Sequence, residues 1–436
     1  MNTLTMNVPT MPRCAVRRRT SSNATPRPGL LERAFTAVVV FLSTGGVLPL
    51  LRLEGGGVAV DELEGDLVMQ IIWLAVYGVT LLLLAARARS TLLLLGRERW
   101  LILLCGLAAA SIIWSAAPGV TFRRTIALFG TTAFGVYLAS RYTVAELLRL
   151  LCWVLGAAMV LSVAVVVYAP NLGIGSGDTG WLGIFVHKNT LGRTMALTIL
   201  VFLFQLRQRG TANRLVSVAM LGVACLTLLG SQSIAGMLTA ATVVVTVPLW
   251  PILRLQRTLV VASAVFVLMV VITAACWIGT DIEVMVATVG KDPSLSGRAG
   301  LWVAVMDSIA SRPWLGHGYS AFWLGWEGDS AVIWRVIGWL PPHAHNGILD
   351  LGLELGAVGV ALFAVGFAVA IGRAAVLIQR TRTVCGLWPI SYLVFMVMVN
   401  LAESTILVRN SIFWMLYVVA CVWLISSRGD ERTVKA

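Results

Sequence analysis

Three short blocks of the sequence bring together side chains that can bind an anion and move a proton. Along the chain they supply His187, Lys188, Asn189, Arg193, Arg298, His317, His343, His345 and Asn346. Arginine forms bidentate hydrogen bonds with phosphate oxygens, and histidine titrates near neutral pH, so that it can act as a general base. This combination predicts a site for a phosphorylated substrate with a base beside it.

The apolar composition of the chain places these residues in a membrane protein. Of its 436 residues, 58% are hydrophobic and only 12% are charged, which excludes an ordinary soluble globular protein. Apolar stretches long enough to cross a bilayer predict twelve spans, at residues 34–51, 67–86, 100–115, 122–140, 147–169, 187–206, 215–230, 233–252, 258–279, 346–371, 386–404 and 410–426. We therefore expect an all-α, polytopic membrane protein with about 12 transmembrane helices.

The charges between the predicted spans indicate how the chain is oriented. Arginine residues occur in every second connection, whereas residues 52–66 carry five acidic residues against the single Arg52. By the positive-inside rule, the basic connections and both termini face the cytoplasm. The net charge of +13 is thereby explained without a nucleic-acid partner, and all four histidines are predicted to lie on the outer side.

The predicted spans divide the chain into five parts. These are a disordered cytoplasmic tail, nine spans, a large outer loop, three further spans and a second cytoplasmic tail, at residues 1–33, 34–279, 280–345, 346–426 and 427–436. Connections as long as the outer loop are uncommon and often functional. We expect functional residues in that loop.

Within the large outer loop, the stretch SGRAGLWVAVMDSIASRPWLG predicts an amphipathic helix at the membrane surface. Ser296 can cap this helix, and Trp302, Val305, Met306 and Ile309 fall on one face at helical spacing. Aromatic residues crowd the segment that follows, namely Trp314, Tyr319, Phe322, Trp323, Trp326, Trp334 and Trp339. Either an aromatic belt at the membrane interface or a surface that stacks on sugars would explain them.

Positive charges recur where the predicted helices begin on the outer side. The residues concerned are Arg123, Arg124, His187, Lys188, Arg193, Arg298, His343 and His345. A cation at a helix N-terminus is unfavourable by about 0.3 to 1 kcal/mol. An anion bound among these helix starts would reverse that cost, because backbone N–H groups and arginine side chains would point at it. For Lys188 and Arg124, side chains that reach for the membrane boundary are an alternative interpretation.

A metal site is not expected. His343 and His345 are too close in sequence to form a helical ligand pair, and no cysteine or group of carboxylates completes a ligand set. None of the seven cysteines falls in a predicted outer connection, which argues against a disulfide framework. No cofactor is predicted.

Three stretches of the chain resemble the superfamily of O-antigen ligases and polymerases. They are GWLGIFVHKNTLGRTMAL at 180–197, SGRAGLWVAVMDSIASRPWLGHGYSAFW at 296–323 and HAHNGILDLGLELGAVGV at 343–360. The segment that contains HKN is most similar to exopolysaccharide polymerases of the ExoQ type. The resemblance covers residues 100–425, approximately.

The resemblance implies a glycosyltransferase with a GT-C-like fold in the bacterial inner membrane. Its site would face the periplasm, where the large outer loop lies, and its donor and acceptor would be undecaprenyl-diphosphate-linked glycans, with no metal. Matched position by position, the family's essential histidine falls on His345, with His343 as the second candidate, and a family arginine falls on Arg298. We expect substrate contacts from Arg193, His187, Lys188, Asn189, Arg124, Asn346 and His317.

One position departs from the family pattern. Many relatives carry arginine or lysine shortly after a serine in the short outer connection that here reads GSQSIAG, where Ile234 stands instead. Arg193 or Arg124 would then supply the second positive charge that holds the donor. Two carboxylates, those of Asp350 and Glu354, could act in the site or be buried helix residues.

The predicted function is polymerisation of repeat units into an exopolysaccharide, with a separate protein that regulates chain length. A ligase that transfers a lipid-linked glycan to another acceptor could use the same residues and is the first alternative. A polysaccharide-related transporter is the second alternative. The span interiors contain almost no carboxylates, since Glu354 and Glu403 lie near predicted ends, whereas a transporter is expected to carry charged residues near the midplane.

Overall fold

The computed structural model describes residues 28–46, 67–175, 180–208, 211–249, 297–381 and 383–432. Within these ranges the regular structure is helical and no β-strand occurs, which confirms the all-α expectation. The predicted span at 258–279, the outer loop before Gly297 and both predicted tails up to 27 and from 433 lie outside the described residues.

Eleven of the twelve predicted spans coincide with a helix in the described part of the chain. These helices are α1 (Leu30–Leu42), α4 (Leu67–Ala85), α6 (Arg99–Ala110), α7 (Pro118–Arg141), α8 (Val144–Tyr168), α10 (Lys188–Arg207), α11 (Thr211–Ser231), α12 (Ile234–Leu249), α17 (Gly347–Arg380), α18 (Trp388–Asn400) and α19 (Ile412–Arg432). Five of them, α4, α8, α10, α11 and α17, are long and apolar enough to cross a membrane. The protein is therefore a multi-pass membrane protein, and the total of twelve spans stays a prediction.

Helix α10 lies in the middle of the bundle, whereas α4 lies at its rim. Of the most apolar part of α10, 72% is buried, against 17% for α4. Helix α10 packs against α8, α11 and α12, while α7 packs against α4 and α19. The block that begins at His187 is thus carried by the most enclosed of the five candidate spans.

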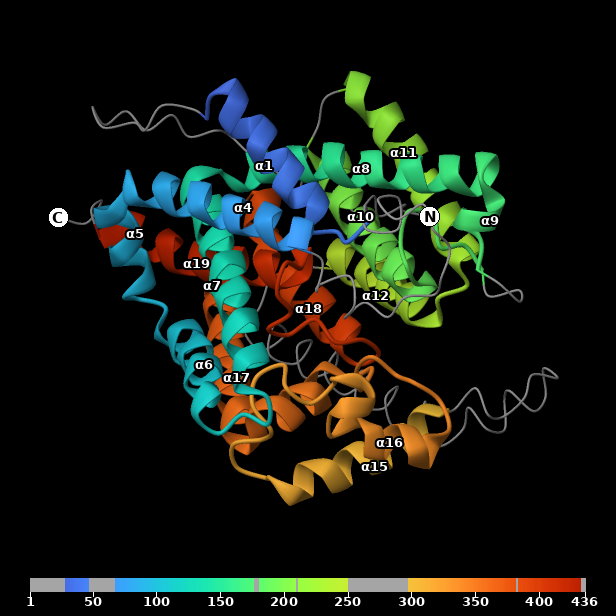
Figure 1. The fold of residues 1–436 in the computed structure, drawn as a ribbon. Helices are drawn as coiled ribbons and strands as arrows, with labels where there is room; N and C mark the ends of the chain where they lie inside the picture. Colours follow the sequence, from blue (N-terminus) through green and yellow to red (C-terminus); the bar gives the residue numbers. More distant parts are fainter. Residues whose placement is uncertain are drawn as a thin grey trace, which may run out of the picture.

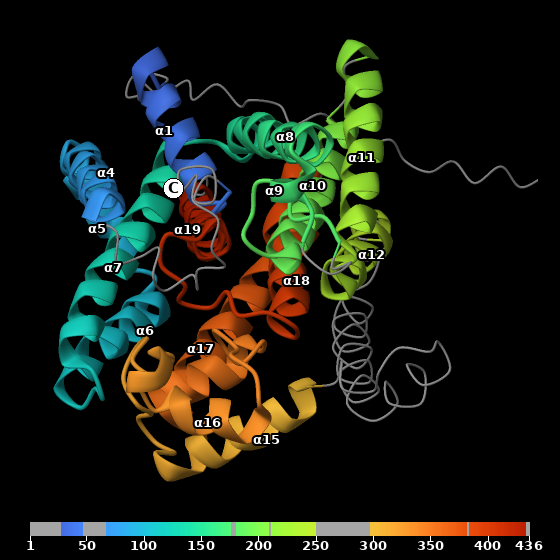
Figure 2. The same ribbon diagram turned by 45° about the vertical axis from the view of Figure 1, so that its right-hand side comes forward.

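The described part of the predicted outer loop, from Gly297 onward, folds into a layer at one end of the molecule. Helices α15 (Gly297–Ser311) and α16 (Ser330–Ile337) lie together at that end, and α1 and α8 lie at the opposite end (Figures 1 and 2). The layer has its own apolar core, made by Leu301, Val305, Phe322, Trp323, Ile333, Ala344 and Leu353. The loop helix expected from the sequence is present.

The buried face of α15 agrees with the predicted one at Trp302, Val305 and Ile309, which pack in or against the layer core, and differs at Met306. The sequence placed Met306 on the apolar face, but this residue is 56% exposed, whereas Leu301 and Val305 are fully buried. The loop helix is apolar on more than one side, so helical spacing alone did not select the face that packs. Leu301, which was not on the predicted face, is buried because it packs into the layer core beneath the helix.

Helix α17 is broken at Gly356, where φ is 61° and ψ is −164°. Residues other than glycine rarely adopt this conformation, and a Cβ atom here would lie 2.3 Å from the carbonyl carbon of Trp314. The carbonyl groups that the break releases accept bonds from the loop. That of Leu353 accepts from the N–H of His317 at 2.8 Å, and that of Glu354 accepts from the next N–H at 2.9 Å. The first part of α17 is therefore bonded to the loop layer.

Candidate active site

Glu403 lies at the centre of the candidate site, in the segment between α18 and α19. The residue is only 4% exposed. A guanidinium nitrogen of Arg193 lies 3.4 Å from Oε2, and one of Arg298 lies 3.8 Å from Oε1. The amide of Asn189 donates to Oε1 at 2.8 Å. One carboxylate thus joins α10, the start of α15 and the connection before α19.

Two histidines complete the shell of this carboxylate. His345 Nδ1 lies 3.4 Å from Oε1 of Glu403, and His343 Nε2 lies 3.7 Å from Oε2. The two imidazole rings are 4.2 Å apart between centroids. The structure therefore brings the three predicted catalytic residues, His345, His343 and Arg298, to one carboxylate.

The backbone fixes the protonation of His343. Its Nδ1 accepts a hydrogen bond from the N–H of His345 at 3.0 Å, so the proton of the neutral ring is on Nε2, facing Glu403. Burial, together with the neighbouring His345, lowers the pKa of His343 to about 3. His343 is therefore neutral, with Nε2–H directed toward the carboxylate at 3.7 Å, and is poorly suited to act as a base.

The cluster carries a net positive charge. Burial by itself raises the pKa of Glu403, but the hydrogen bond with His345 and the charge of Arg193 outweigh it and hold the pKa below its usual range. Glu403 is thus ionised and contributes one negative charge, while Arg193 and Arg298 contribute two positive charges. An anion of a substrate would find one uncompensated positive charge here.

The HKN block is positioned by the start of α10. His187 is the N-cap residue, and its Nδ1 accepts from the N–H of Asn189 at 3.2 Å. The side chain of Asn189 then bridges Glu403 and the hydroxyl of Ser233, which donates to its Oδ1 at 3.1 Å. Helices α10 and α12 approach closely enough for this bond because Gly192 has no side chain, and a Cβ there would lie 2.4 Å from Cβ of Ser233.

Asp350, which the sequence left undecided, holds the loop that presents the two histidines. Its carboxylate accepts from the N–H of Ala344 at 3.0 and 3.1 Å and from Nε1 of Trp323 at 2.7 Å. The hydroxyl of Ser404 also donates to it. His345 has a φ of 50°, in the left-handed region that residues other than glycine seldom adopt. Asp350 therefore acts as a positioning residue.

Several predicted contact residues have other partners. Arg124 donates to the carbonyl of Ser320 at 2.7 Å, which links α7 to the loop layer. Lys188 is the first residue of α10 and stands beside His187. Ile234 is 70% exposed at the start of α12, so the position at which relatives carry a cation does not face the bundle interior.

His317 and Asn346 also have clear structural roles. The ring of His317 lies 2.7 Å from a carboxylate oxygen of Asp329 and 3.2 Å from the carbonyl of Ser308. The side chain of Asn346 caps α17, because its Oδ1 accepts from the N–H groups of the second and third helical residues at 3.0 and 3.2 Å. Both residues hold the layer that carries His345.

Glu403 is the residue that sequence reasoning missed. It was noted only as a carboxylate near the end of a span, which argued against transport. The available signal was its position, because it is the single acidic residue between positions 401 and 411 and lies at the end of the predicted span 386–404 that the orientation rule places outside. An isolated carboxylate on the side of the four histidines was a reason to pair it with them.

The same side chains could in principle hold a metal ion. One ligand atom each of His343, His345 and Glu403 lie within 4.8 Å of one another. However, both oxygens of Glu403 already face guanidinium groups, and a divalent cation would be repelled by these charges. The arrangement suits an anion better than a cation.

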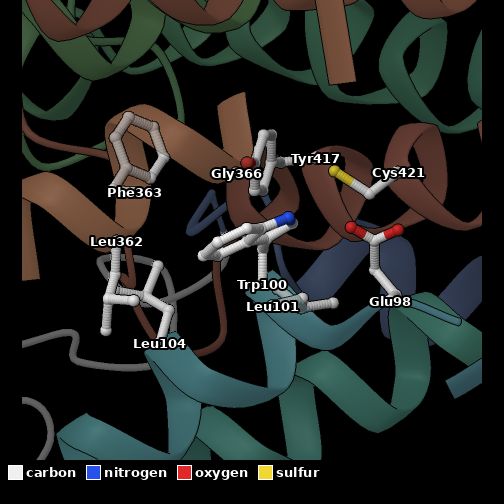
Figure 3. A pocket seen from close by; sticks show the side chains of 9 residues that line it. All are labelled: Glu98, Trp100, Leu101, Leu104, Leu362, Phe363, Gly366, Tyr417 and Cys421. Atoms are coloured by element: carbon white, nitrogen blue, oxygen red, sulfur yellow. The ribbon is translucent and has the colours of Figure 1, made fainter. Parts of the chain in front are cut away.

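A hollow lies between α6, α17 and α19, away from the candidate site. Figure 3 shows Trp100 in the middle of its lining, with Glu98 and Cys421 to one side and Leu104 and Phe363 to the other. Glu98 is paired with Arg373 of α17. None of the predicted site residues lines this hollow, and its remaining lining is apolar.

Comparisons with known proteins bear on this arrangement. The O-antigen ligase family model matches residues 219–364. The chain is 28% identical over 306 residues to the exopolysaccharide production protein ExoQ of Rhizobium meliloti (strain 1021), and the match covers 67% of this chain and 69% of that protein. It is 40% identical over 74 residues to a protein described as a polysaccharide ligase of Rickettsia prowazekii (strain Madrid E), which covers 16% of this chain and 18% of that protein. A similar protein of Rickettsia conorii is 39% identical over 77 residues.

Proposed function

With its resemblance to the O-antigen ligases and to ExoQ as the premise, we propose that this protein polymerises undecaprenyl-diphosphate-linked repeat units into an exopolysaccharide at the periplasmic face of the bacterial inner membrane. Both termini would be cytoplasmic. The observation that carries the proposal is the pairing of His345 with Glu403 between Arg193 and Arg298. This arrangement supplies a base and an anion site side by side.

The two arginines would bind the diphosphate of the donor. As the bond between the anomeric carbon and the phosphate oxygen breaks, the electron pair leaves with the diphosphate, and the guanidinium groups stabilise the charge that grows there. Nε of Arg193 is buried and has no hydrogen-bond partner among the described residues. Arg193 therefore keeps a donor for a phosphate oxygen while its Nη1 faces Glu403.

His345 would accept the proton of the attacking hydroxyl. With Nδ1–H directed at Glu403, the lone pair of Nε2 is left for the acceptor, whose oxygen then forms the new bond to the anomeric carbon. The carboxylate fixes the tautomer of His345 and stabilises the imidazolium that results. His343 would line the same carboxylate as a neutral ring, 3.7 Å from its Oε2.

We place polymerisation before ligation because the HKN segment resembles polymerases of the ExoQ type. The match to ExoQ runs along two thirds of the chain, whereas the matches to the Rickettsia proteins described as ligases cover 16% of it. A ligase would use the same base and the same anion site with a different acceptor. A transporter would need no base beside the anion site.

Reconstitution of the full-length protein in lipid tests the proposal. The substrate is the lipid-diphosphate-linked repeat unit isolated from the cells that make the protein, and the products are separated by size. We expect a ladder still attached to the lipid diphosphate, lost in Arg298→Ala and His345→Ala. Transfer of a single glycan to an added non-diphosphate acceptor would favour a ligase, and movement of the substrate to the other leaflet would favour a transporter.

A further inference from the structure

An exposed tryptophan lies against the candidate base. The indole ring of Trp339 is 6.0 Å from the imidazole of His345 between ring centroids, at an angle of 32°. Trp339 is 36% exposed, whereas His345 is 8% exposed. The imidazole is therefore enclosed by the protein, while the ring next to it remains accessible.

The position of Trp339 is fixed by the end of α16. Gly338 terminates the helix with a φ of 76°, and its N–H donates to the carbonyl of Trp334 at 3.1 Å. Nε1 of Trp334 donates in turn to the carbonyl of Pro341 at 3.1 Å. The chain is thus bonded to α16 on both sides of Trp339, which holds the indole beside His345 before any substrate arrives.

The indole ring of Trp339 could bind the acceptor if the acceptor is a glycan. The face of an indole is electron-rich, and the C–H groups on the apolar face of a sugar ring are weakly positive, so the two can stack. The acceptor hydroxyl must come within hydrogen-bond reach of Nε2 of His345. A sugar that stacks on Trp339 would present its hydroxyl groups to the imidazole beside it.

We propose that Trp339 is the stacking platform for the acceptor sugar that carries the attacking hydroxyl. This inference rests on the proposed function and names the acceptor part of that site. Trp339 would contribute binding and orientation of the acceptor, while Arg193 and Arg298 bind the diphosphate of the donor. The platform would accept different sugars that share an apolar face, and hydrogen bonds from other residues would discriminate between them.

The test is a kinetic comparison of Trp339→Ala, Trp339→Phe and Trp314→Ala in reconstituted full-length protein. Trp314 is a matched control, because it lies in the same layer and is 71% exposed. We expect Trp339→Ala to raise the KM for the lipid-linked repeat unit as acceptor by about tenfold. Trp339→Phe should keep most of the wild-type KM, and Trp314→Ala should keep all of it.

Measuring the binding of undecaprenyl diphosphate without a glycan distinguishes the diphosphate part of the site from the acceptor part. Trp339→Ala should bind this probe as wild type does, which also shows that the variant is folded. An unchanged acceptor KM in Trp339→Ala, or an equal effect of Trp314→Ala, would overturn the inference and indicate an interfacial anchor. Absence of elongation by the wild type would instead refute the proposed function itself.

Discussion

Replacing Glu403 by glutamine should change binding and turnover in opposite directions. The substitution removes one negative charge from a cluster that contains two guanidinium groups and leaves its shape almost unchanged. If an anion of the donor binds beside these groups, it should bind more tightly. If Glu403 also fixes the tautomer of His345, the reaction should become slower.

The magnitude of the binding effect follows from the distances. Nitrogen atoms of Arg193 and Arg298 lie 3.4 and 3.8 Å from the oxygens of Glu403. A phosphate oxygen bonded to the far side of either guanidinium would then be about 7 Å from the carboxylate, since a charge-assisted bond adds about 2.9 Å. At an effective dielectric constant of about 20, two charges at that distance repel by about 2.4 kcal/mol. The Kd for undecaprenyl diphosphate should therefore fall by up to about 50-fold.

Turnover should respond in the other direction. Without the carboxylate, Nδ1 of His345 loses its charged acceptor, and the glutamine can turn either its oxygen or its NH2 group toward the ring. We expect the rate at saturating substrate to fall by about 100-fold or more, the range that general bases contribute. This loss would occur although the donor is bound more tightly.

Both quantities can be measured on one preparation in lipid nanodiscs, with calorimetric titration of undecaprenyl diphosphate and the rate of ladder formation. Glu327→Gln is the matched control, because it makes the same change at an exposed carboxylate of the loop layer, outside the cluster. It should leave the Kd within about twofold. Weaker diphosphate binding in Glu403→Gln, or an unchanged rate, would refute the reasoning.

Three further predictions concern pH, metal and stability. The pKa of His343 is lowered to about 3 in the folded protein, so on acidification the unfolded chain takes up a proton at this residue before the folded protein does, and the unfolding temperature should fall as the pH drops below about 6.5. His343→Asn should make the unfolding temperature depend less on pH, and an equal dependence in the variant would count against a neutral His343. EDTA should leave the rate of ladder formation unchanged, whereas a loss that zinc restores would assign a metal to His343, His345 and Glu403. Arg373→Met leaves the buried Glu98 carboxylate without its partner and should destabilise the protein by about 3 to 5 kcal/mol, while the double variant with Glu98→Gln should recover part of this loss in thermal unfolding.

The sequence predicted the residues of the candidate site better than their arrangement. His345, Arg298 and Arg193 were recognised from motifs and from cations at helix starts, which are local signals. Glu403 was not placed with them, because the contact between residues 193 and 403 depends on how distant helices pack. Sequence spacing carries no information on such contacts in a single chain.

The helices were predicted well because apolar length is itself the physical requirement for crossing a membrane. The break in α17 was not predicted, since the stretch around Gly356 reads as a continuous apolar helix. Only the approach of the backbone of Trp314 shows why a glycine is needed there. Arg124 was expected at the substrate, but its hydrogen bond to Ser320 depends on the fold of the loop layer.

The break at Gly356 has a mechanical consequence. Asn346 caps the first part of α17, which is bonded to the loop layer, whereas Glu403 lies in the connection between α18 and α19 of the bundle. His345 and Glu403 thus belong to different parts of the fold. Their own 3.4 Å contact and the hydrogen bond between Ser404 and Asp350 connect these two parts. Under the proposed function, a tilt of the layer as a glycan enters or leaves would change the distance between His345 and Glu403, which would couple the movement of the glycan to the alignment of the base.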